Sequence, residues 1–89
     1  MITTVESPGF KRALKKLVKR DPAMALRFRD KLAMFLIDPY HPSLEAHKLS
    51  GTLKDSQAFS LTHDLRIVFS YLEPKVVLLE DIGSHDEVY

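Results

Sequence analysis

Apolar residues recur at three- and four-residue spacing between positions 10 and 18, which is the period of an α-helix. This apolar stripe consists of Phe10, Ala13, Leu14, Leu17 and Val18. Just before it, Ser7 can accept a hydrogen bond from the free N–H groups of a helix start, and Pro8 has the fixed φ that suits a first helical position. The partly β-branched residues 2–5 precede this start and predict an edge strand.

A second helical period covers residues 22–38, PAMALRFRDKLAMFLID. Asp21 and Pro22 repeat the signal of a capping residue followed by proline. Asp38 ends the stretch, because the residue before a proline is disfavoured in the α region. The apolar stripe of this helix consists of Ala25, Phe28, Leu32, Phe35 and Leu36. The link between the two helices is so short that we expect an antiparallel helical hairpin.

The second half of the chain has the patterns of β-strands. Residues 39–51 contain two prolines, a glycine and two histidines without a sustained period, so we predict a loop there. Three stretches that follow alternate in polarity or are rich in β-branched and aromatic residues: SQAFSLT, LRIVFSYL and KVVLLEDIG. His63-Asp64 and Glu73-Pro74-Lys75 separate these stretches, which predicts a three-stranded meander.

The predicted fold is therefore α+β, with the order β-α-α-β-β-β in one domain over residues 1–89. In this fold the helical hairpin packs on one face of a mostly antiparallel sheet, which the N-terminal strand joins. Helices gathered on one face leave the other face partly open, and function is expected there.

Composition narrows the class of protein. The chain has no cysteine, which excludes disulfides and thiolate chemistry. The N-terminus lacks the pattern of a signal peptide, and no apolar run is long enough to span a membrane. A soluble, cytoplasmic protein is expected.

The charges are unevenly distributed along the chain. Residues 1–50 carry ten Lys and Arg against five Asp and Glu, whereas residues 51–89 carry three against seven. Residues 10–20, FKRALKKLVKR, hold six basic residues and no acid. Such a block is either a solvated helix face or a surface that attracts nucleic acid or an acidic protein.

The four histidines have ordinary structural explanations beside functional ones. His41 fits a loop, His47 can cap or bond locally before a glycine turn, and His63 fits the turn between two strands. Asp64 also suits that turn, because its carboxylate can bond the local backbone. An imidazole exchanges protons near neutral pH, so each of these histidines is also chemically capable.

Arg66 stands in the middle of an apolar strand stretch. Side chains alternate along a strand, and the better core face consists of Leu65, Ile67, Phe69 and Tyr71. Arg66 is then expected on the less covered face, where its guanidinium suits a phosphate that it can meet with two parallel hydrogen bonds. The alternative is a salt bridge to Glu80 or Asp81 on the next strand.

A basic helix, a strand arginine and a histidine at a strand end together indicate phosphodiester chemistry. The carboxylates are scattered and no histidine spacing matches a zinc pattern, so neither a metal nor another cofactor is expected. RNA cleavage without metal can use the 2′-OH of the substrate as nucleophile. The protein then supplies a general base, a general acid and a cation.

The segments HKLSG, DLRIVFSY and IGSHDEVY, in this order behind two short helices, resemble the RelE/ParE superfamily of type II toxins. They are most similar to its YafQ-like branch, whose members often end in GTHDEVY-like segments. The resemblance covers nearly the whole chain, and the last segment is the most specific. It implies a toxin that cleaves mRNA, typically in the ribosomal A site and without metal.

The resemblance also implies roles for single residues. His85 matches a C-terminal histidine that gives or takes a proton, and Tyr89 matches a terminal aromatic residue that stacks on a base or orients it. Arg66 matches a strand arginine that stabilises the cleaved phosphate. Asp64 and His47 match an aspartate and a histidine of the branch, and either is expected to help activate the 2′-OH.

One position departs from the family pattern. Ser60 stands where the branch has a second histidine, and His63, three residues later, is a possible substitute. This departure affects the expected efficiency and codon preference more than the class of activity. The basic residues expected to grip messenger or ribosomal RNA are Lys15, Lys19, Lys48 and Lys54.

Two other functions remain open at this level. ParE-type members share the scaffold and inhibit DNA gyrase without being enzymes, and a decayed toxin would be retained only as an antitoxin partner. The expected partners are mRNA, the ribosome and a cognate antitoxin that binds across the basic helix and the open sheet. A toxin–antitoxin heterotetramer is one expected assembly, and no membrane partner is expected.

Overall fold

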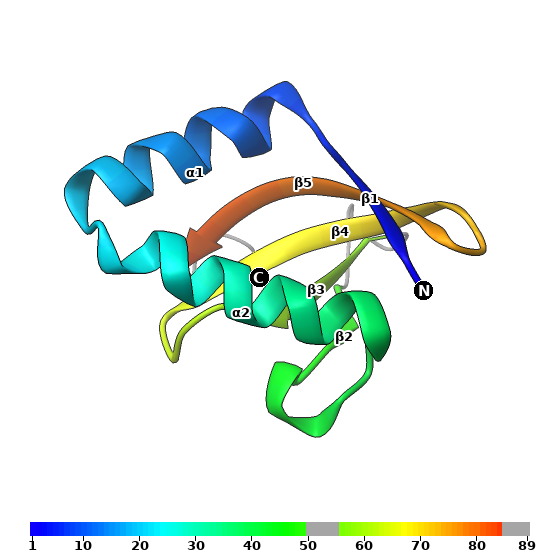
Figure 1. Ribbon diagram of the computed structural model, residues 1–89. Helices are drawn as coiled ribbons and strands as arrows, with labels where there is room; N and C mark the ends of the chain where they lie inside the picture. Colours follow the sequence, from blue (N-terminus) through cyan, green and yellow to red (C-terminus); the bar gives the residue numbers. More distant parts are fainter. Residues whose placement is uncertain (50–55, 85–89) are drawn as a thin grey trace.

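Two helices pack on a five-stranded sheet in the computed structural model, which describes residues 1–49 and 56–84 (Figure 1). The elements are β1 (Thr3–Glu6), α1 (Pro8–Arg20), α2 (Ala23–Ile37), the 3-10 helix η1 (Pro42–Leu44), β2 (His47–Lys48), β3 (Gln57–Ser60), β4 (Leu65–Glu73) and β5 (Val76–Ser84). The strand order is β1-β5-β4-β3-β2, with β1 parallel to β5 and the other pairs antiparallel. The predicted α+β fold is confirmed.

The first helix begins where the sequence predicts. Ser7 Oγ accepts a hydrogen bond from the Phe10 amide at 3.0 Å, and Pro8 occupies the first helical position. The same hydroxyl donates to the carbonyl oxygen of Glu80 at 2.8 Å. Ser7 therefore caps α1 and also ties the start of this helix to β5, which lies near the other end of the sequence.

The second helix runs back antiparallel to the first, as predicted (Figure 1). Asp21 Oδ1 accepts from the Ala23 amide at 3.3 Å, so the aspartate helps to start the helix. Phe35 is fully buried and Phe28 packs against the core, but the prediction for Ala25 is wrong, because this residue is exposed. Met24 packs against the core in its place, and its longer side chain covers more of the sheet.

Three phenylalanines join α2 to the sheet. The ring of Phe35 stacks on Phe59 with a centroid distance of 4.6 Å and meets the edge of Phe69 at 5.0 Å. Such offset and edge contacts add to the free energy gained by burying the rings. The core face of β4 is the predicted one, since Ile67 and Phe69 are fully buried.

The sheet face away from the helices is only partly open. Leu49, Ala58 and Val68 form a small buried cluster there. Ser60 lies on the same face and is 6% exposed. A function that uses this face therefore has to use its rim rather than its centre.

The predicted loop at residues 39–51 contains two short elements within the part that is described. These are η1 and β2, and β2 adds a fifth strand to the predicted four. Glu45 has a positive φ of 51°, which turns the chain between η1 and β2. A two-residue strand shows no hydrophobic period, which is why the sequence did not reveal it.

Two tyrosines are linked at the end of β4. The Tyr71 hydroxyl donates to the Tyr40 hydroxyl at 3.3 Å, and Tyr40 donates to Gln57 Oε1 at 3.1 Å. Burial and then the bond to Tyr40 raise the pKa of Tyr71 from 10.0 to about 12.

We expect absorbance titration of the phenolates to show this raised pKa of Tyr71, with Tyr71→Phe identifying the signal. The unfolded chain loses this proton first, so the stability contributed is fully present below pH 10 and is lost as the pH rises through about 12. Tyr40→Phe should lower the pKa of Tyr71 but leave it above 10, since burial is the largest cause. A Tyr71 that titrates at 10 in the wild type would contradict the prediction.

Replacing Ser7 with alanine should lower the free energy of unfolding by about 1–2 kcal/mol, because the helix start loses its cap. Chemical denaturation monitored by circular dichroism measures this difference. Ser7→Thr is the matched control, since it keeps a hydroxyl that can both accept and donate. Equal losses in the two variants would show that the hydroxyl is not the cause.

Candidate functional site

The turn between β3 and β4 is closed by the side chain of Thr62. Its Oγ1 accepts hydrogen bonds from the amides of Asp64 at 3.2 Å and Leu65 at 3.1 Å. The sequence predicted that the Asp64 carboxylate would make such local bonds, and this detail is wrong. A threonine hydroxyl that bonds the backbone two and three residues ahead makes the same kind of turn, which leaves the exposed Asp64 side chain outside it.

Arg66 lies directly beside this turn, on the face of the sheet away from the helices. In the ladder it pairs with Ser60 on one side and Gly83 on the other. Its Nη1 donates to the carbonyl oxygens of Thr62 at 3.0 Å and His63 at 3.2 Å, and it lies 3.4 Å from Ser60 Oγ. Ser60 Oγ in turn donates to the Thr62 carbonyl oxygen at 2.8 Å. One end of the guanidinium is thus fixed by the turn.

The opposite edge of the Arg66 guanidinium has no acceptor. Among the described residues neither Nε nor Nη2 has a hydrogen-bond partner, and Nε is also buried from solvent. A buried donor without a partner costs about 1–3 kcal/mol. The Nε–Nη2 edge is the side-on edge of the fork that meets a carboxylate or a phosphate with two parallel bonds. This edge has the chemistry to bind an oxyanion, which reaches Nε only when the atoms that cover it move aside.

The alternative salt bridge of Arg66 to Glu80 or Asp81 is not formed. The Glu80 carboxylate accepts from Ser56 Oγ at 3.0 Å, and Asp81 Oδ1 accepts from the Ile82 amide at 2.8 Å. Within residues 1–49 and 56–84 the one ion pair joins Arg29 and Asp30 on the surface of α2. The charge of Arg66 is therefore not neutralised by a described carboxylate.

His47 and Lys48 form β2, at the edge of the sheet next to β3. His47 pairs with Ala58, and Ala58 pairs with Val68, so the register puts His47 on the same face as Arg66. Its Nδ1 lies 2.8 Å from the carbonyl oxygen of Glu45, which favours the tautomer with the proton on Nδ1. In that tautomer the lone pair is on the other ring nitrogen, Nε2.

The remaining predicted residues lie apart from this arrangement or outside the described chain. His63 is exposed at the turn, and its carbonyl oxygen rather than its ring contacts Arg66. Lys15 and Lys19 are exposed on α1. The predicted site residues His85, Tyr89 and Lys54 lie outside the described residues. The described part of β5 ends at Ser84, which pairs with Leu65.

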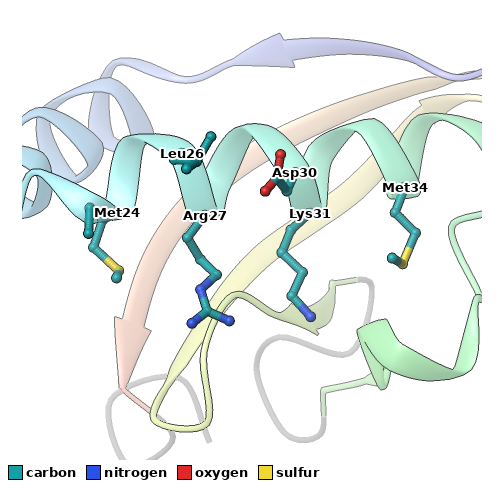
Figure 2. A pocket seen from close by; sticks show the side chains of 7 residues that line it. Met24, Leu26, Arg27, Asp30, Lys31 and Met34 are labelled. Atoms are coloured by element: carbon teal, nitrogen blue, oxygen red, sulfur yellow. The ribbon is translucent and has the colours of Figure 1, made fainter.

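A hollow of about 440 Å³ runs along α2, and none of the predicted site residues lines it within the described chain. Figure 2 shows that Met24, Arg27, Lys31 and Met34 project from the same side of the helix. Lys31 Nζ donates to the Ser43 carbonyl oxygen at 3.3 Å, which links this side of α2 to η1. Methionines and the aliphatic stems of arginine and lysine offer contact area rather than reacting groups.

Solved structures of known proteins decide the family. No protein-family model and no curated protein matches the sequence. A metal-bound toxin from Helicobacter pylori is 32% identical to this chain, with 100% of both chains covered and a TM-score of 0.72. YafQ from E. coli strain BL21(DE3) is 19% identical, with 100% of this chain and 99% of that chain covered and a TM-score of 0.73. The chain belongs to the family of this H. pylori toxin, and it has the fold of YafQ.

A third structure contains a partner. In the DinJ–YafQ complex from E. coli, the similar chain is 20% identical, with 100% of this chain and 99% of that chain covered and a TM-score of 0.70. At this identity the likeness shows the RelE-like fold.

The structure shows what surrounds Ser60, the position at which the sequence departs from the YafQ-like pattern. Ser60 is the direct ladder partner of Arg66 and bonds both Arg66 and the turn. The sequence singled out Ser60 only as a missing histidine, and it missed Thr62 altogether. A Thr placed two residues before an Asp in a short link is the signal that could have revealed this turn.

Two further features of the described chain bear on its class. No helix in residues 1–49 and 56–84 is long and apolar enough to cross a membrane. In the same residues no group of three or more His, Asp or Glu side chains is arranged to hold a metal ion.

Thr62→Val should lower the free energy of unfolding by about 1–2 kcal/mol, because two turn amides lose their acceptor. Chemical denaturation measures the loss, and Thr62→Ser, which keeps the hydroxyl, should stay close to the wild type. If valine and serine behave alike, the hydroxyl does not hold the turn.

Proposed function

We propose that this chain is the toxin of a type II toxin–antitoxin system and cleaves mRNA as a metal-independent endoribonuclease, on the ribosome. The observation that carries the proposal is the guanidinium of Arg66, held at one end by the β3–β4 turn and without an acceptor among the described residues at its other edge. The 32% identity to the H. pylori toxin and the fold shared with YafQ support it.

In this reaction Arg66 binds the scissile phosphate. Charge builds up on the non-bridging oxygens when the 2′-oxygen attacks phosphorus, and a fixed cation stabilises that charge without having to reorganise. The bonds from Nη1 to the turn carbonyls keep the guanidinium in place, and the absence of a carboxylate partner within the described chain keeps its charge available.

Two proton transfers complete the reaction. A base removes the proton of the 2′-OH as the new oxygen–phosphorus bond forms, and His85 protonates the 5′-oxygen as its bond to phosphorus breaks. The products are a 2′,3′-cyclic phosphate and a free 5′-OH. Asp64 and His47 are the two candidates for the base, and His63 is the candidate substitute for the histidine that Ser60 replaces. Tyr89 stacks on a nucleobase of the RNA or orients it.

Basic residues around the site hold the RNA. Lys48 follows His47 in β2 at the sheet edge, and Lys15 and Lys19 extend the positive surface along α1. Lys54 completes the predicted set. Such contacts neutralise phosphates without reading sequence, so they set affinity and its salt dependence.

The partner is a cognate antitoxin, as DinJ is found with YafQ in the E. coli complex. The exposed basic residues of α1 and the face of the sheet that carries Arg66 are the surfaces that we assign to it. An antitoxin with an acidic segment would compete with RNA for these cations, which explains neutralisation by simple occupancy. Two toxins on an antitoxin dimer would give the heterotetramer.

The H. pylori relative is a metal-bound toxin, so the metal-independent mechanism needs its own test. We expect the chain to cleave mRNA on added ribosomes as before once it has been dialysed against a chelator, since Arg66 and the protein's own acid and base supply the required groups. Primer extension before and after chelation measures this. Activity that disappears with the chelator and returns with added zinc or copper would overturn this part of the proposal.

Arg66→Ala should lower the rate of cleavage by at least about 100-fold, because the developing charge loses its cation. His85→Ala should lower it by about 100- to 10,000-fold through loss of the general acid. Growth arrest in a bacterial host and primer extension on an abundant mRNA measure both effects.

Arg29→Ala is the matched control for Arg66→Ala, since Arg29 is an exposed arginine that pairs only with Asp30. It should arrest growth and cleave mRNA like the wild type. Full activity in the Arg66 and His85 variants would sink the proposal. Growth arrest with intact mRNA and inhibited supercoiling would indicate gyrase as the target.

A further inference from the structure

Two adjoining hollows lie between α1 and the end of the sheet that carries Arg66. The first, of about 280 Å³, lies between Lys16 and Arg20 of α1 and Leu65 and Gly83 of the sheet. The second, of about 390 Å³, lies between the same Arg20 and the β3–β4 turn. They share Leu17, Arg20 and Leu65, so they form one continuous groove, which we call the α1–turn groove.

The two hollows differ in charge. Asp21 and Asp64 line the second one together with Arg20. Among the described residues, Lys16 and Arg20 are the charged ones that line the first, and no described carboxylate lines it. An anion is therefore favoured in the first hollow.

Neither cation is engaged elsewhere in the described chain. Lys16 and Arg20 are both exposed and have no hydrogen bond or ion pair to residues 1–49 or 56–84. They are four residues apart on the helix, so their side chains lie on the same side, one turn from each other. Together they offer a pair of donors to a single anionic group.

The first hollow adjoins the proposed catalytic residue. Gly83, which lines the hollow, is the direct ladder partner of Arg66, and Leu65 precedes Arg66 in β4. Directly paired residues of neighbouring antiparallel strands have Cα atoms about 4.5–5.5 Å apart. Gly83 has no side chain, so only its backbone separates this hollow from the strand position of Arg66.

We propose that Lys16 and Arg20 bind a second backbone phosphate of the RNA strand whose scissile phosphate Arg66 holds. This inference rests on the proposed function and adds a phosphate subsite to it. The RNA strand passes round the end of the sheet, with one phosphate on each side of the β4–β5 ladder. The second phosphate does not react, so the subsite adds affinity for the strand.

The lysines that the sequence singled out on α1 have a different position. The pair Lys15 and Lys19 is rotated by about 100° around the helix axis from the pair Lys16 and Arg20. Neither Lys15 nor Lys19 lines either hollow. The proposed function already assigns both lysines to the RNA, so the matched control comes from α2, where Arg27 and Arg29 are exposed and line neither hollow.

Lys16→Ala/Arg20→Ala and Arg27→Ala/Arg29→Ala remove the same charge from exposed positions, so both variants should fold with little loss of stability. Their affinity is measured with a short single-stranded RNA that lacks the 2′-OH at the cut and therefore stays intact. Loss of the one phosphate contact should reduce the slope of log K against log salt by about 0.7 in the first variant, since each phosphate neutralised on a single strand contributes about 0.7. The control should change the slope much less.

Amide signals in NMR spectra locate the binding. The signals of Ala13 and Leu17, which line the first hollow from α1, should move when this RNA is added to the wild type or to the Arg27/Arg29 variant, and stay in place with the Lys16/Arg20 variant. In cleavage assays the Lys16/Arg20 variant should raise KM at least about 10-fold with a nearly unchanged kcat, because a contact to a phosphate that does not react is made equally in the ground state and the transition state.

Two outcomes would overturn the subsite. Equal losses of affinity in the two variants would mean that the RNA follows the overall positive charge rather than the groove. Cleavage by the wild type with an unchanged Lys16/Arg20 variant would remove the subsite and leave the endoribonuclease in place. Conversely, a wild type that moves the Leu17 signal with RNA but cleaves no mRNA would support the subsite and count against the proposed function.

Discussion

The pairing of β4 with β5 is the constraint on which the rest of this structure depends. Phe69 pairs with Leu79 and Val68 pairs with Asp81, so Glu80 is an extra residue in β5 and forms a bulge. Side chains alternate along a strand, and one extra residue moves everything after it to the opposite face. Because of the bulge, Leu79 and Ile82 both pack against the helical side.

The same bulge connects the helices to the rim of the sheet. The carbonyl oxygen of Glu80 accepts from Ser7 Oγ, the cap of α1, while the Glu80 carboxylate accepts from Ser56 on the opposite face. Beyond the bulge, Gly83 comes to lie opposite Arg66. The start of α1 and the surroundings of Arg66 are thus set by one irregularity. A sheet without it would present a side chain other than Gly83 beside the arginine.

Much of this arrangement could be predicted from local signals. The cap at Ser7, the break at Asp38 and the alternation of β4 each depend on residues close in sequence, and each was predicted correctly. The bulge could not be predicted, because Glu80 carries no special sequence signal and the extra residue shows only against its partner strand. The two-residue β2 could not be predicted either, because a strand needs several residues to show an alternating pattern.

The candidate site was predictable in its residues but less so in its contacts. The face of Arg66 follows from alternation, yet its partners are the carbonyl oxygens of a turn rather than Glu80 or Asp81. That choice depends on Thr62, which folds the turn so that its carbonyl oxygen faces Nη1. From the sequence alone, an acidic residue on the next strand is the expected partner of an arginine. The sequence does not show that a turn brings two backbone carbonyl oxygens to the guanidinium instead.

Arg66 has hydrogen-bond acceptors at Nη1 but none among the described residues at its Nε–Nη2 edge, and this arrangement indicates a role in function rather than in stability. A guanidinium that served only to hold the turn would gain from a partner on its second edge, and an unpaired buried donor costs about 1–3 kcal/mol. The chain carries carboxylates on the neighbouring strand, yet Glu80 and Asp81 are bonded to Ser56 and Ile82 instead. Directing these acids away from Arg66 keeps the charge uncompensated among the described residues, at a cost to the folded state. A cation that is fixed in advance and still lacks its anion is the arrangement in which electrostatic stabilisation of a reacting phosphate is most effective.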